Sequence, residues 1–371
     1  MKILVTGGAG FVGSHLVDAL LEAGHEVRVL DNLCQQVHGE SAKRPDYLNA
    51  GAELQIGDVR DSEAVGRALE GVEVVFHLAA AVGVGQSMYE MAHYVSVNSL
   101  GAAVLLEEIV ARRDRIRKML VASSMSIYGE GAYRDGRGEV VFPALRSEAD
   151  LAARRFELEG ADGSPLEAIP TSEDKPLRPT SIYAVTKRDH EEMFLSVGAA
   201  YGIPAVALRY FNIYGTRQAL SNPYTGVMAI FSARLLNRNR PMIFEDGLQT
   251  RDFVHVSDVV RANLLAMEAE LTDGRVYNVG TGRPTTILRI AELLAEQLGF
   301  DEPPEVVGRF RAGDIRHCYG DIGQIRDELG YHPEVDLAHG VAELLAWLRS
   351  QTAVDRIDRA ARELEERGLA R

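Results

Sequence analysis

Short apolar runs rich in β-branched residues alternate with longer amphipathic stretches along the first third of the chain. The apolar runs at 3–5, 27–30, 54–56, 74–76 and 119–121 have the length and composition of buried strands. Helices are predicted between them, over residues 11–23, 62–70 and 92–112. Because strands that alternate with helices are typical of βαβ units, we predict an α/β fold, a doubly wound parallel sheet with helices on both faces.

The alternation stops between residues 130 and 178, where charged residues, glycines and prolines are scattered without a period. We expect a charged surface excursion there, with one short helix near 147–158. The alternation resumes with a helix over 183–201 and a strand over 205–208.

Shorter and more mixed pieces follow residue 215, as expected of a smaller C-terminal mixed α/β lobe. Helices are predicted near 225–236, 257–269, 286–298 and 337–349, and strands at 242–244 and 253–254. In the tail, Val354, Ile357, Ala360 and Leu364 recur at helical spacing with charges between them. This pattern predicts an amphipathic helix that docks on the body of the protein rather than on a membrane.

Composition and charge exclude several classes of protein. The 371 residues include 40 Lys and Arg against 54 Asp and Glu, a formal charge of −14, which argues against a nucleic-acid partner. Cys34 and Cys318 are far apart and outside any CxxC motif, so neither a disulfide framework nor a metal site is expected. No run approaches the roughly 18 apolar residues of a membrane span, and Met1 leads directly into the first strand. We therefore expect a soluble, cytoplasmic protein.

A glycine-rich turn follows the first predicted strand. The segment Thr6–Gly13 contains Gly8-x-Gly10-x-x-Gly13 between a strand and a helix, which is the context that a dinucleotide-binding turn requires. The expected contacts of this turn with a pyrophosphate come from Gly7, Gly10, Phe11, Val12 and Gly13. The first turn of the helix would add backbone N–H groups and the positive end of its dipole.

Acidic residues after the next strands refine the choice of cofactor. Asp31 ends the second strand at the distance where a carboxylate accepts hydrogen bonds from the adenosine ribose. Since Asp31 would repel the 2′-phosphate of NADP and Asn32 brings no countercharge, we expect NAD, with Asp31 and Asn32 among its contacts. Asp58, after the third strand, is either an acceptor for the adenine amine or an ordinary residue at a helix N-terminus.

A tyrosine and a lysine open the long helix of the central region. Tyr183 and Lys187 are four residues apart and therefore share one helix face. A tyrosine has a pKa near 10, but a neighbouring ammonium and a positive nicotinamide ring both favour the phenolate. Ser123 and Ser124 stand at the end of a predicted strand, where a hydroxyl can bind the reacting oxygen. The alternative is a surface lysine beside a half-buried tyrosine.

Motifs across residues 3 to about 322 resemble those of the extended short-chain dehydrogenases/reductases, and within them the nucleotide-sugar epimerases. The motifs that carry the resemblance are Thr6-Gly7-x-x-Gly10-x-x-Gly13, Asp58–Asp61, His77–Ala80, Asn98, Ser123–Gly129, Tyr183-x-x-x-Lys187, Arg209–Gly215 and Arg251–Val256. The resemblance implies a Rossmann-like NAD-binding domain at 1–210, with the excursion inserted, a substrate-binding lobe at 211–352 interleaved with it, and the tail at 353–371. It also implies a homodimer that pairs the helices at 92–112 and 183–201. The alternative is that the apolar faces of these helices pack inside one chain.

The resemblance also implies roles for individual residues. Ser124, Tyr183 and Lys187 would be the catalytic trio. Further contacts with NAD would come from Val59, Leu78, Ala79, Ala80, Asn98, Ser123, Tyr183, Lys187 and Tyr210. On the substrate side, Ser124 and Ser126 would face the sugar, Asn212, Arg251 and Arg311 would hold the diphosphate, and Asp314 would bind the nucleotide ribose. For Arg251, an ion pair with Asp252 is the alternative.

Neighbouring positions narrow the reaction. Dehydratases of this family carry an Asp-Glu pair beside the catalytic Thr, where this chain has Met125 and Ser126, which provide neither acid nor base. Asp31 disfavours NADPH-dependent reductases, so we expect a redox-neutral inversion at C4 of a nucleotide sugar through a 4-keto intermediate.

A narrower resemblance concerns the substrate. The segments 81–90, 123–129 and 217–224 are similar to bacterial dTDP-L-rhamnose 4-epimerase-like proteins, which make dTDP-6-deoxy-L-talose. The long excursion departs from compact hexose 4-epimerases. The alternatives are another NAD-dependent sugar-nucleotide enzyme, such as a UDP-glucuronate 4-epimerase or decarboxylase, and, more remotely, a non-catalytic dinucleotide sensor.

Overall fold

A parallel sheet forms the centre of the computed structural model, which describes residues 1–39, 43–270, 273–311 and 313–371. Within these residues the sheet has seven strands: β1 (Lys2–Thr6), β2 (Glu26–Asp31), β3 (Glu53–Ile56), β4 (Val74–His77), β5 (Lys118–Ser124), β9 (Ala205–Tyr210) and β13 (Arg275–Val279). Their order across the sheet is β13-β9-β5-β4-β1-β2-β3. The predicted doubly wound α/β architecture is confirmed.

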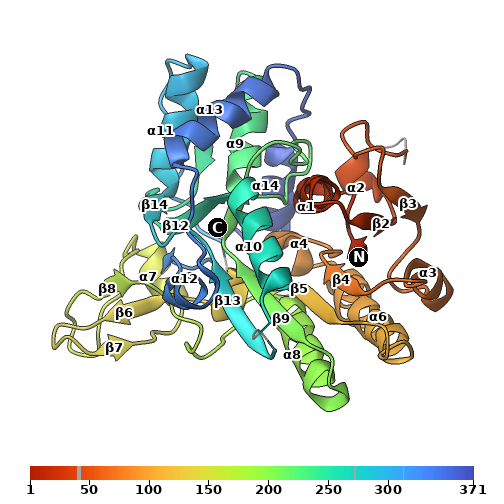
Figure 1. Ribbon diagram of the computed structural model, residues 1–371. Helices are drawn as coiled ribbons and strands as arrows, with labels where there is room; N and C mark the ends of the chain where they lie inside the picture. The colour runs from red at the N-terminus through yellow and green to blue at the C-terminus, as the bar shows by residue number, and fades with distance from the viewer. Residues whose placement is uncertain (40–42, 271–272, 312) are drawn as a thin grey trace.

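Helices cover both faces of this sheet (Figure 1). One layer contains α1 (Phe11–Glu22) and α10 (Val256–Glu268), and the other contains α3 (Ser62–Ala68), α6 (Gly101–Val110) and α8 (Ile182–Tyr201). Ile3 and Val5 of β1 pack into the first layer and Leu4 into the second, all fully buried. Because both faces are covered, the strands read as continuous apolar runs rather than as alternating ones.

The strand order reverses between β1 and β4, which are neighbours although β2 and β3 lie between them in the chain. The segments that follow the two strands therefore diverge and leave a crevice at their carboxyl ends. Ligands of open α/β sheets bind at such a point.

The helix predicted over 92–112 is interrupted. It consists of α5 (Met91–Tyr94), a π-helical turn at Val95–Leu100 and α6, preceded by the short α4 (Val84–Ser87). Asn98 lies inside the π-helical turn and is fully buried. A π turn carries an extra residue that helical periodicity does not register, so the sequence pattern indicated one straight helix.

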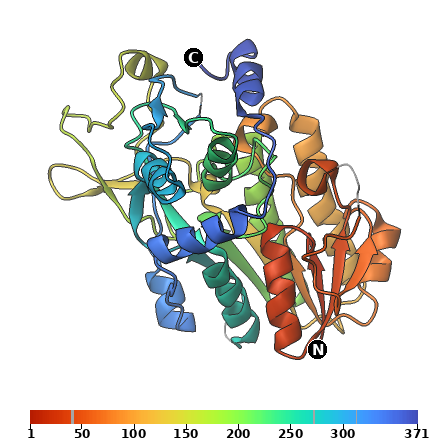
Figure 2. The ribbon, with the colours of Figure 1, turned by 90° about the horizontal axis from the view of Figure 1, so that it is seen from above.

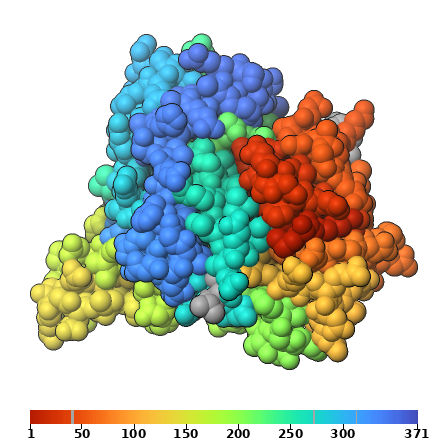
Figure 3. Space-filling model, in the orientation of Figure 1, coloured from red at the N-terminus to blue at the C-terminus, as the bar shows by residue number. Residues whose placement is uncertain are grey.

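The excursion is more ordered than predicted. The expected helix near 147–158 is reduced to α7 (Glu148–Ala152), and a three-stranded antiparallel sheet accompanies it. Its strands are β6 (Ala132–Arg134), β7 (Val140–Val141) and β8 (Glu167–Ile169). These strands are too short to produce a recognisable period. Figure 3 shows the excursion, in yellow, projecting from one side of the molecule.

The C-terminal lobe packs α9 (Val227–Leu236), α11 (Ile287–Leu298) and α13 (Leu337–Leu348) around a second apolar core. Small strands join it to the body: β10 (Asn212–Tyr214), β12 (Thr250–His255), β14 (Pro284–Thr286) and β16 (His317–Cys318), together with the pair β11 (Met242–Ile243) and β15 (Glu305–Val306). The sequence pattern missed β13, which pairs with β9 and makes the edge of the main sheet. With α10 and α12 (Gly323–Leu329), β13 brings part of the 211–352 segment into the layers around the main sheet.

The tail forms α14 (Ile357–Glu366), and Ala360, Ala361 and Leu364 are buried against the body. Docking of the tail is therefore confirmed. Val354, which the spacing placed on the apolar face, precedes the helix and is exposed. Figure 2 shows this helix, in dark blue, at the edge of the molecule next to the C-terminus. Among the described residues, no helix is both long enough and apolar enough to cross a membrane.

Candidate active site

A cavity of about 700 Å³ runs along the carboxyl ends of the central strands. Its walls come from three parts of the chain that are distant in sequence: the glycine turn and strand ends of the sheet, the C-terminal lobe, and α14. The crevice between β1 and β4 opens into it, since Gly7 and Leu78 both line the wall. A ligand in this cavity would contact both the sheet and the lobe.

The glycine turn is shaped for close packing on one side and for a ligand on the other. Gly7 has φ +69°, and a Cβ there would lie 2.8 Å from the backbone of Ala79. A Cβ on Gly13 would lie 2.3 Å from the Gly7 carbonyl oxygen. Gly10 is different, because its nearest contact would be the Gly7 oxygen at 3.3 Å. Gly10 therefore leaves space at the N-terminus of α1 where a pyrophosphate can approach the backbone.

Asp31 ends β2 at the cavity wall and is buried. Its carboxylate accepts hydrogen bonds from Ala9 N at 3.0 Å and Leu33 N at 2.9 Å, which hold the turn and the following loop together. Each carboxylate oxygen has a further lone pair, so a ribose hydroxyl can still donate to it. Asn32 lies beside it on the wall and donates to Asp58 at 3.2 Å.

Two of the residues predicted to bind NAD do not line the cavity. Asp58 pairs with Arg60 at 2.7 Å, and hydrogen bonds from this arginine lower the pKa of Asp58 to about 2. Asn98 contacts the cavity wall only indirectly, through the backbone of Ala81. Its side chain accepts a hydrogen bond from Ala81 N at 2.8 Å and donates one to Ala81 O at 3.1 Å. The π-helical turn thereby fixes the loop after β4. The remaining predicted NAD contacts all line the cavity: Gly7, Gly10, Phe11, Val12, Gly13, Asp31, Asn32, Val59, Leu78, Ala79, Ala80, Ser123, Tyr183, Lys187 and Tyr210.

Ser124, Tyr183 and Lys187 converge on the middle of the cavity. Ser124 is the last residue of β5, and its Oγ accepts from Ser126 N at 3.2 Å and from Ser126 Oγ at 2.9 Å. Tyr183 lies in the first turn of α8, whose N-cap Ser181 accepts from Ala184 N. Lys187, one turn later, donates from Nζ to Ala122 O at 2.6 Å. A strand end and a helix start thus bring the three side chains together.

Burial works against the charged form of both titratable members. It raises the pKa of Tyr183 to about 12, while a hydrogen bond with Ser124 acts in the opposite direction. Burial also lowers the pKa of Lys187 to about 7. His190 Nδ1 lies 3.5 Å from Lys187 Nζ, and burial holds the pKa of this histidine well below its usual range. Around neutral pH the tyrosine is a phenol, and a further positive charge is required to make it a base.

Asn212 and Arg251 stand on the wall of the C-terminal lobe. The Oδ1 atom of Asn212 is buried without a hydrogen-bond partner in the described chain. Arg251 donates to the carbonyl oxygens of Thr250, Ile315 and Arg316 at 2.7–3.0 Å, which leaves part of its five-donor fork for a ligand. The alternative of an ion pair between Arg251 and Asp252 is wrong. Asp252 instead accepts hydrogen bonds from Thr281 and from the backbone N–H groups of Gly282 and Gly320.

Arg311 and Asp314 lie on a neighbouring segment of the same wall. Ser126, which follows β5, also lines the cavity. Arg311 Nε donates to Asp314 at 2.8 Å, and its guanidinium lies 4.8 Å from the centre of the Phe244 ring. Every residue predicted to bind substrate therefore lines the cavity. A planar cation, a carboxylate and an aromatic ring together suit a nucleoside diphosphate.

Sequence reasoning missed several residues of the wall. Phe244 and Gln249 come from the loop after β11, Tyr224 precedes α9, and Met88 follows α4. Ile357, Ala360, Ala361, Leu364 and Leu369 come from the tail. The helical spacing of the tail indicated an apolar face, but no local signal indicated which surface that face covers. Among the described residues, no cluster of His, Cys, Asp or Glu could hold a metal ion.

The residues present fit a dinucleotide such as NAD. The space at Gly10 accommodates a pyrophosphate, Asp31 retains acceptor capacity for a ribose, and Tyr183 and Lys187 face the same cavity. The cofactor half and the substrate half of the cavity are continuous, so a ligand in each half would meet near Ser124 and Tyr183.

Comparison with known proteins agrees with this geometry. Residues 3–147 and 159–280 match the family described as NAD dependent epimerase/dehydratase. A relative named dTDP-L-rhamnose 4-epimerase, from Burkholderia thailandensis, is 36% identical over 94% of this chain and 95% of its own length. The gap in the family match lies inside the excursion.

The chain is also similar to solved structures of nucleotide-sugar 4-epimerases. The UDP-glucose 4-epimerase of Thermotoga maritima, solved with UDP-glucose, has a TM-score of 0.76 at 34% identity and covers 94% of this chain and 99% of its own. The UDP-glucose 4-epimerase of Thermus thermophilus, solved with NAD, has a TM-score of 0.74 at 31% identity and covers 95% of this chain and 100% of its own.

Proposed function

This chain belongs to the NAD-dependent epimerase/dehydratase family, and from that premise we propose that it inverts C4 of a dTDP-hexose through a 4-keto intermediate. The first candidate is dTDP-L-rhamnose, which would become dTDP-6-deoxy-L-talose. The observation that carries the proposal is the meeting of Ser124, Tyr183 and Lys187 beside the glycine turn in one continuous cavity.

In the proposed mechanism, Tyr183 and Ser124 act on the hydroxyl group of the sugar C4 atom. Tyr183 as phenolate takes the proton from the C4 hydroxyl, while Ser124 hydrogen-bonds the same oxygen as its bond to carbon becomes a carbonyl. A bound NAD would supply the acceptor for the hydride of C4 and the donor that gives it back to the opposite face, and the glycine turn, Asp31 and Lys187 would hold this cofactor. Tyr183 then returns its proton to the oxygen. No external reductant is consumed, and Met125 and Ser126 offer no acid or base for dehydration.

The electrostatics make Tyr183 dependent on its neighbours. Because burial raises its pKa to about 12, the tyrosine becomes a base only when positive charge stabilises the phenolate. The Lys187 ammonium and a nicotinamide ring are the two sources of that charge. Lys187 also presents donors to a cofactor ribose from the same helix face.

The lobe side of the cavity would hold the rest of the substrate. Asn212, Arg251 and Arg311 would bind the diphosphate, Asp314 the nucleotide ribose, and Ser126 the sugar together with Ser124. The diphosphate would stay bound while the 4-keto sugar rotates in the cavity, so that either face of the C4 carbonyl can receive the hydride. The relative named dTDP-L-rhamnose 4-epimerase supports a dTDP-sugar over other nucleotide sugars.

Replacement of Tyr183 tests the mechanism. Tyr183→Phe should lower kcat by at least about 10³-fold because the general base is lost. The content of NAD, measured by release and quantification of the dinucleotide, should match that of the wild type. A variant that keeps more than a few per cent of the wild-type rate would contradict the assignment of the base.

A substrate panel tests the specificity. Incubation with dTDP- and UDP-hexoses, with the C4 configuration followed by proton NMR, should show inversion of dTDP-L-rhamnose. Turnover restricted to UDP-sugars would favour a UDP-glucose or UDP-glucuronate 4-epimerase, for which the likeness to the Thermotoga structure with UDP-glucose is the supporting observation. Release of CO₂ from a UDP-uronate would indicate a decarboxylase. Absence of turnover with every nucleotide sugar of the panel would favour the remaining alternative, a non-catalytic dinucleotide sensor.

We also propose a homodimer that acts in the cytoplasm. Apolar side chains are exposed on three adjoining helical segments: Met91 on α5, Val95 and Leu100 on the π-helical turn, and Val185 on α8. A second copy could cover them. Both cysteines are free thiols, which a reducing compartment preserves.

A further inference from the structure

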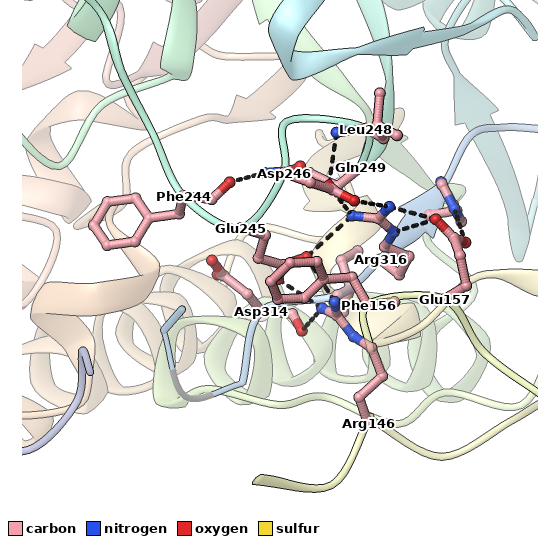
Figure 4. A network of polar contacts seen from close by, with 12 residues as sticks. Arg146, Phe156, Glu157, Phe244, Glu245, Asp246, Leu248, Gln249, Asp314 and Arg316 are labelled. Carbon is pink, nitrogen blue, oxygen red and sulfur yellow. Dashed lines mark hydrogen bonds and ion pairs between the residues drawn. The ribbon is translucent and has the colours of Figure 1, made fainter. Parts of the chain in front are cut away.

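The charged excursion reaches across to the substrate side of the cavity. Its residue Arg146 contacts Glu245, in the loop after β11, and the carbonyl oxygen of Asp314. Its residue Glu157 contacts Arg316 and His317, and Glu130 accepts from the backbone N–H groups of the same two residues. Figure 4 shows Arg146, Glu157, Glu245 and Arg316 meeting in one network. The network therefore joins the excursion to the two segments that carry Phe244 and Asp314.

Arg146 is the central cation of this network. It donates to Glu245 with both terminal nitrogens, at 2.6 and 2.9 Å, and the side chains of both residues are only 2% exposed. The same guanidinium donates to Asp314 O at 3.0 Å and to Phe156 O at 3.3 Å. The Arg146 guanidinium thus fixes the backbone of Asp314 relative to the loop that carries Glu245.

Arg316 closes the network from the other side. Its fully buried guanidinium donates to Glu245 at 3.2 Å, to Asp246 at 2.7 and 2.9 Å, and to Glu157. Glu245 therefore lies between two arginines. Since the two segments are bridged by charged groups with directional hydrogen bonds, their relative position has little freedom.

The loop that Glu245 holds is strained and directs a ring into the cavity. Glu245 has φ +57°, a left-handed conformation that residues other than glycine rarely adopt. Phe244, just before it, lines the cavity and lies against Arg311, while Gln249 donates to Phe244 O at 3.1 Å. In Figure 4 the Phe244 ring points away from the two arginines. Pairing of Glu245 with the arginines thus maintains the conformation that presents Phe244.

We infer that Arg146 is a positioning residue for the nucleotide, which it serves by holding the Glu245 loop and Asp314 so that Phe244, Arg311 and Asp314 face one nucleoside diphosphate. This inference rests on the proposed function. It assigns a role to the excursion, which orders the nucleotide end of the substrate site from outside the cavity. Arg146 itself touches neither the sugar nor the cofactor, because it does not line the cavity.

A buried ion pair by itself would be a weak stabilising device. An apolar pair of the same size often stabilises a core as well or better, because charges lose their hydration on burial. A bidentate guanidinium instead fixes direction, and here the Nη2 atom that binds Glu245 also donates to the backbone carbonyl oxygen of Asp314. The geometry therefore points to precision of the nucleotide site rather than to stability alone.

Binding of nucleoside diphosphates tests this role without requiring turnover. Titration calorimetry with dTDP and with UDP would measure Kd for the wild type, Arg146→Lys and Arg146→Met. We expect at least about tenfold weaker binding in Arg146→Lys, because a lysine keeps the charge but loses the fork. In assays with nucleotide sugar, KM should rise by a similar factor, while kcat stays within about twofold and NAD content is unchanged.

Arg155→Met is the matched control, because Arg155 lies on the same excursion in an exposed ion pair with Asp150. It should bind dTDP and UDP like the wild type. Arg146→Met removes the charge as well and should bind more weakly still; if it does not fold, Arg146→Lys decides. Unchanged Kd in folded Arg146→Lys would overturn the inference, as would a parallel loss of kcat and NAD. A wild type that binds neither dTDP nor UDP would reject the proposed function itself.

Discussion

Tyr183 and Lys187 occupy a site whose burial opposes the charges that their chemistry needs. The pKa of Tyr183 is raised to about 12 and that of Lys187 lowered to about 7, both through burial. Among the groups that contact Tyr183, the hydrogen bond with Ser124 favours the phenolate. Little phenolate is therefore present at neutral pH until substrate and cofactor complete the surroundings of Tyr183.

Ser124→Ala should shift the pH dependence of the reaction. Loss of its hydrogen bond to Tyr183 raises the pKa of that phenol further, so less phenolate is present at a given pH. The acidic limb of the kcat/KM profile should move to higher pH, and kcat should fall by about 10²–10³-fold because a donor to the reacting oxygen is lost. The NAD content serves as the control. An acidic limb at the wild-type position would contradict the role of Ser124.

At the scale of elements, α14 connects the two halves of the molecule over the cavity. Glu363 accepts from Tyr224 at 2.9 Å, Asp358 pairs with Arg234 at 2.7 Å, and Leu364 lies against Gly85 near the start of α4. Beyond the helix, Ala370 forms a β-bridge with Arg311. The tail thus contributes an apolar wall to the substrate half and adjoins a residue predicted to bind the diphosphate.

Leu364→Asp tests whether this wall matters for turnover. A carboxylate on the buried face should loosen α14, admit water and weaken retention of the sugar. We expect KM for the nucleotide sugar to rise about fivefold to tenfold, and free 4-keto sugar to become detectable by mass spectrometry. Glu366→Ala, at an exposed position of the same helix, should behave like the wild type. A Leu364→Asp enzyme with wild-type KM and no free keto sugar would show that the tail is dispensable.

At the scale of the whole molecule, apolar side chains remain exposed on one group of helices. Val95 and Leu100 are 45% and 52% exposed on the segment that includes the π-helical turn, and Val185 is 39% exposed on α8. Figure 1 shows α6 and α8 side by side at one end of the molecule. The first residues of α8 include Tyr183 and Lys187, so a partner on this face would also stabilise the helix turn that carries them.

Val95→Asp combined with Val185→Asp should convert the protein to a monomer, because two carboxylates would be buried without partners in the proposed interface. Sedimentation velocity would measure the change. Ile56→Asp provides the control, since Ile56 is 63% exposed on β3 and away from these helices. If the wild type sediments as a monomer, the proposed dimer is wrong.

Local patterns were sufficient for the parts of the site that lie close together in sequence. The glycine turn needs a strand, tight spacing and a helix within a short segment, and the Tyr183–Lys187 pair needs only one helical turn. By contrast, Asp58 and Asn98 carry family motifs, yet the structure places both side chains outside the cavity wall. Their motif positions indicated proximity to the cofactor, whereas the direction of each side chain depended on Arg60 and Ala81.

The sequence by itself determined the doubly wound sheet, the glycine turn and the Tyr183–Lys187 pair, because each depends on periodicity or spacing within a few turns of chain. Only the tertiary structure decided what the excursion and the tail do. Arg146 meets Glu245 across 99 positions, and Tyr224 meets Glu363 across 139. Hydrophobic periodicity indicates which face of a segment is buried and not which distant surface buries it. The partners of charged residues at such separations are set when the sheet, the lobe and the tail pack together.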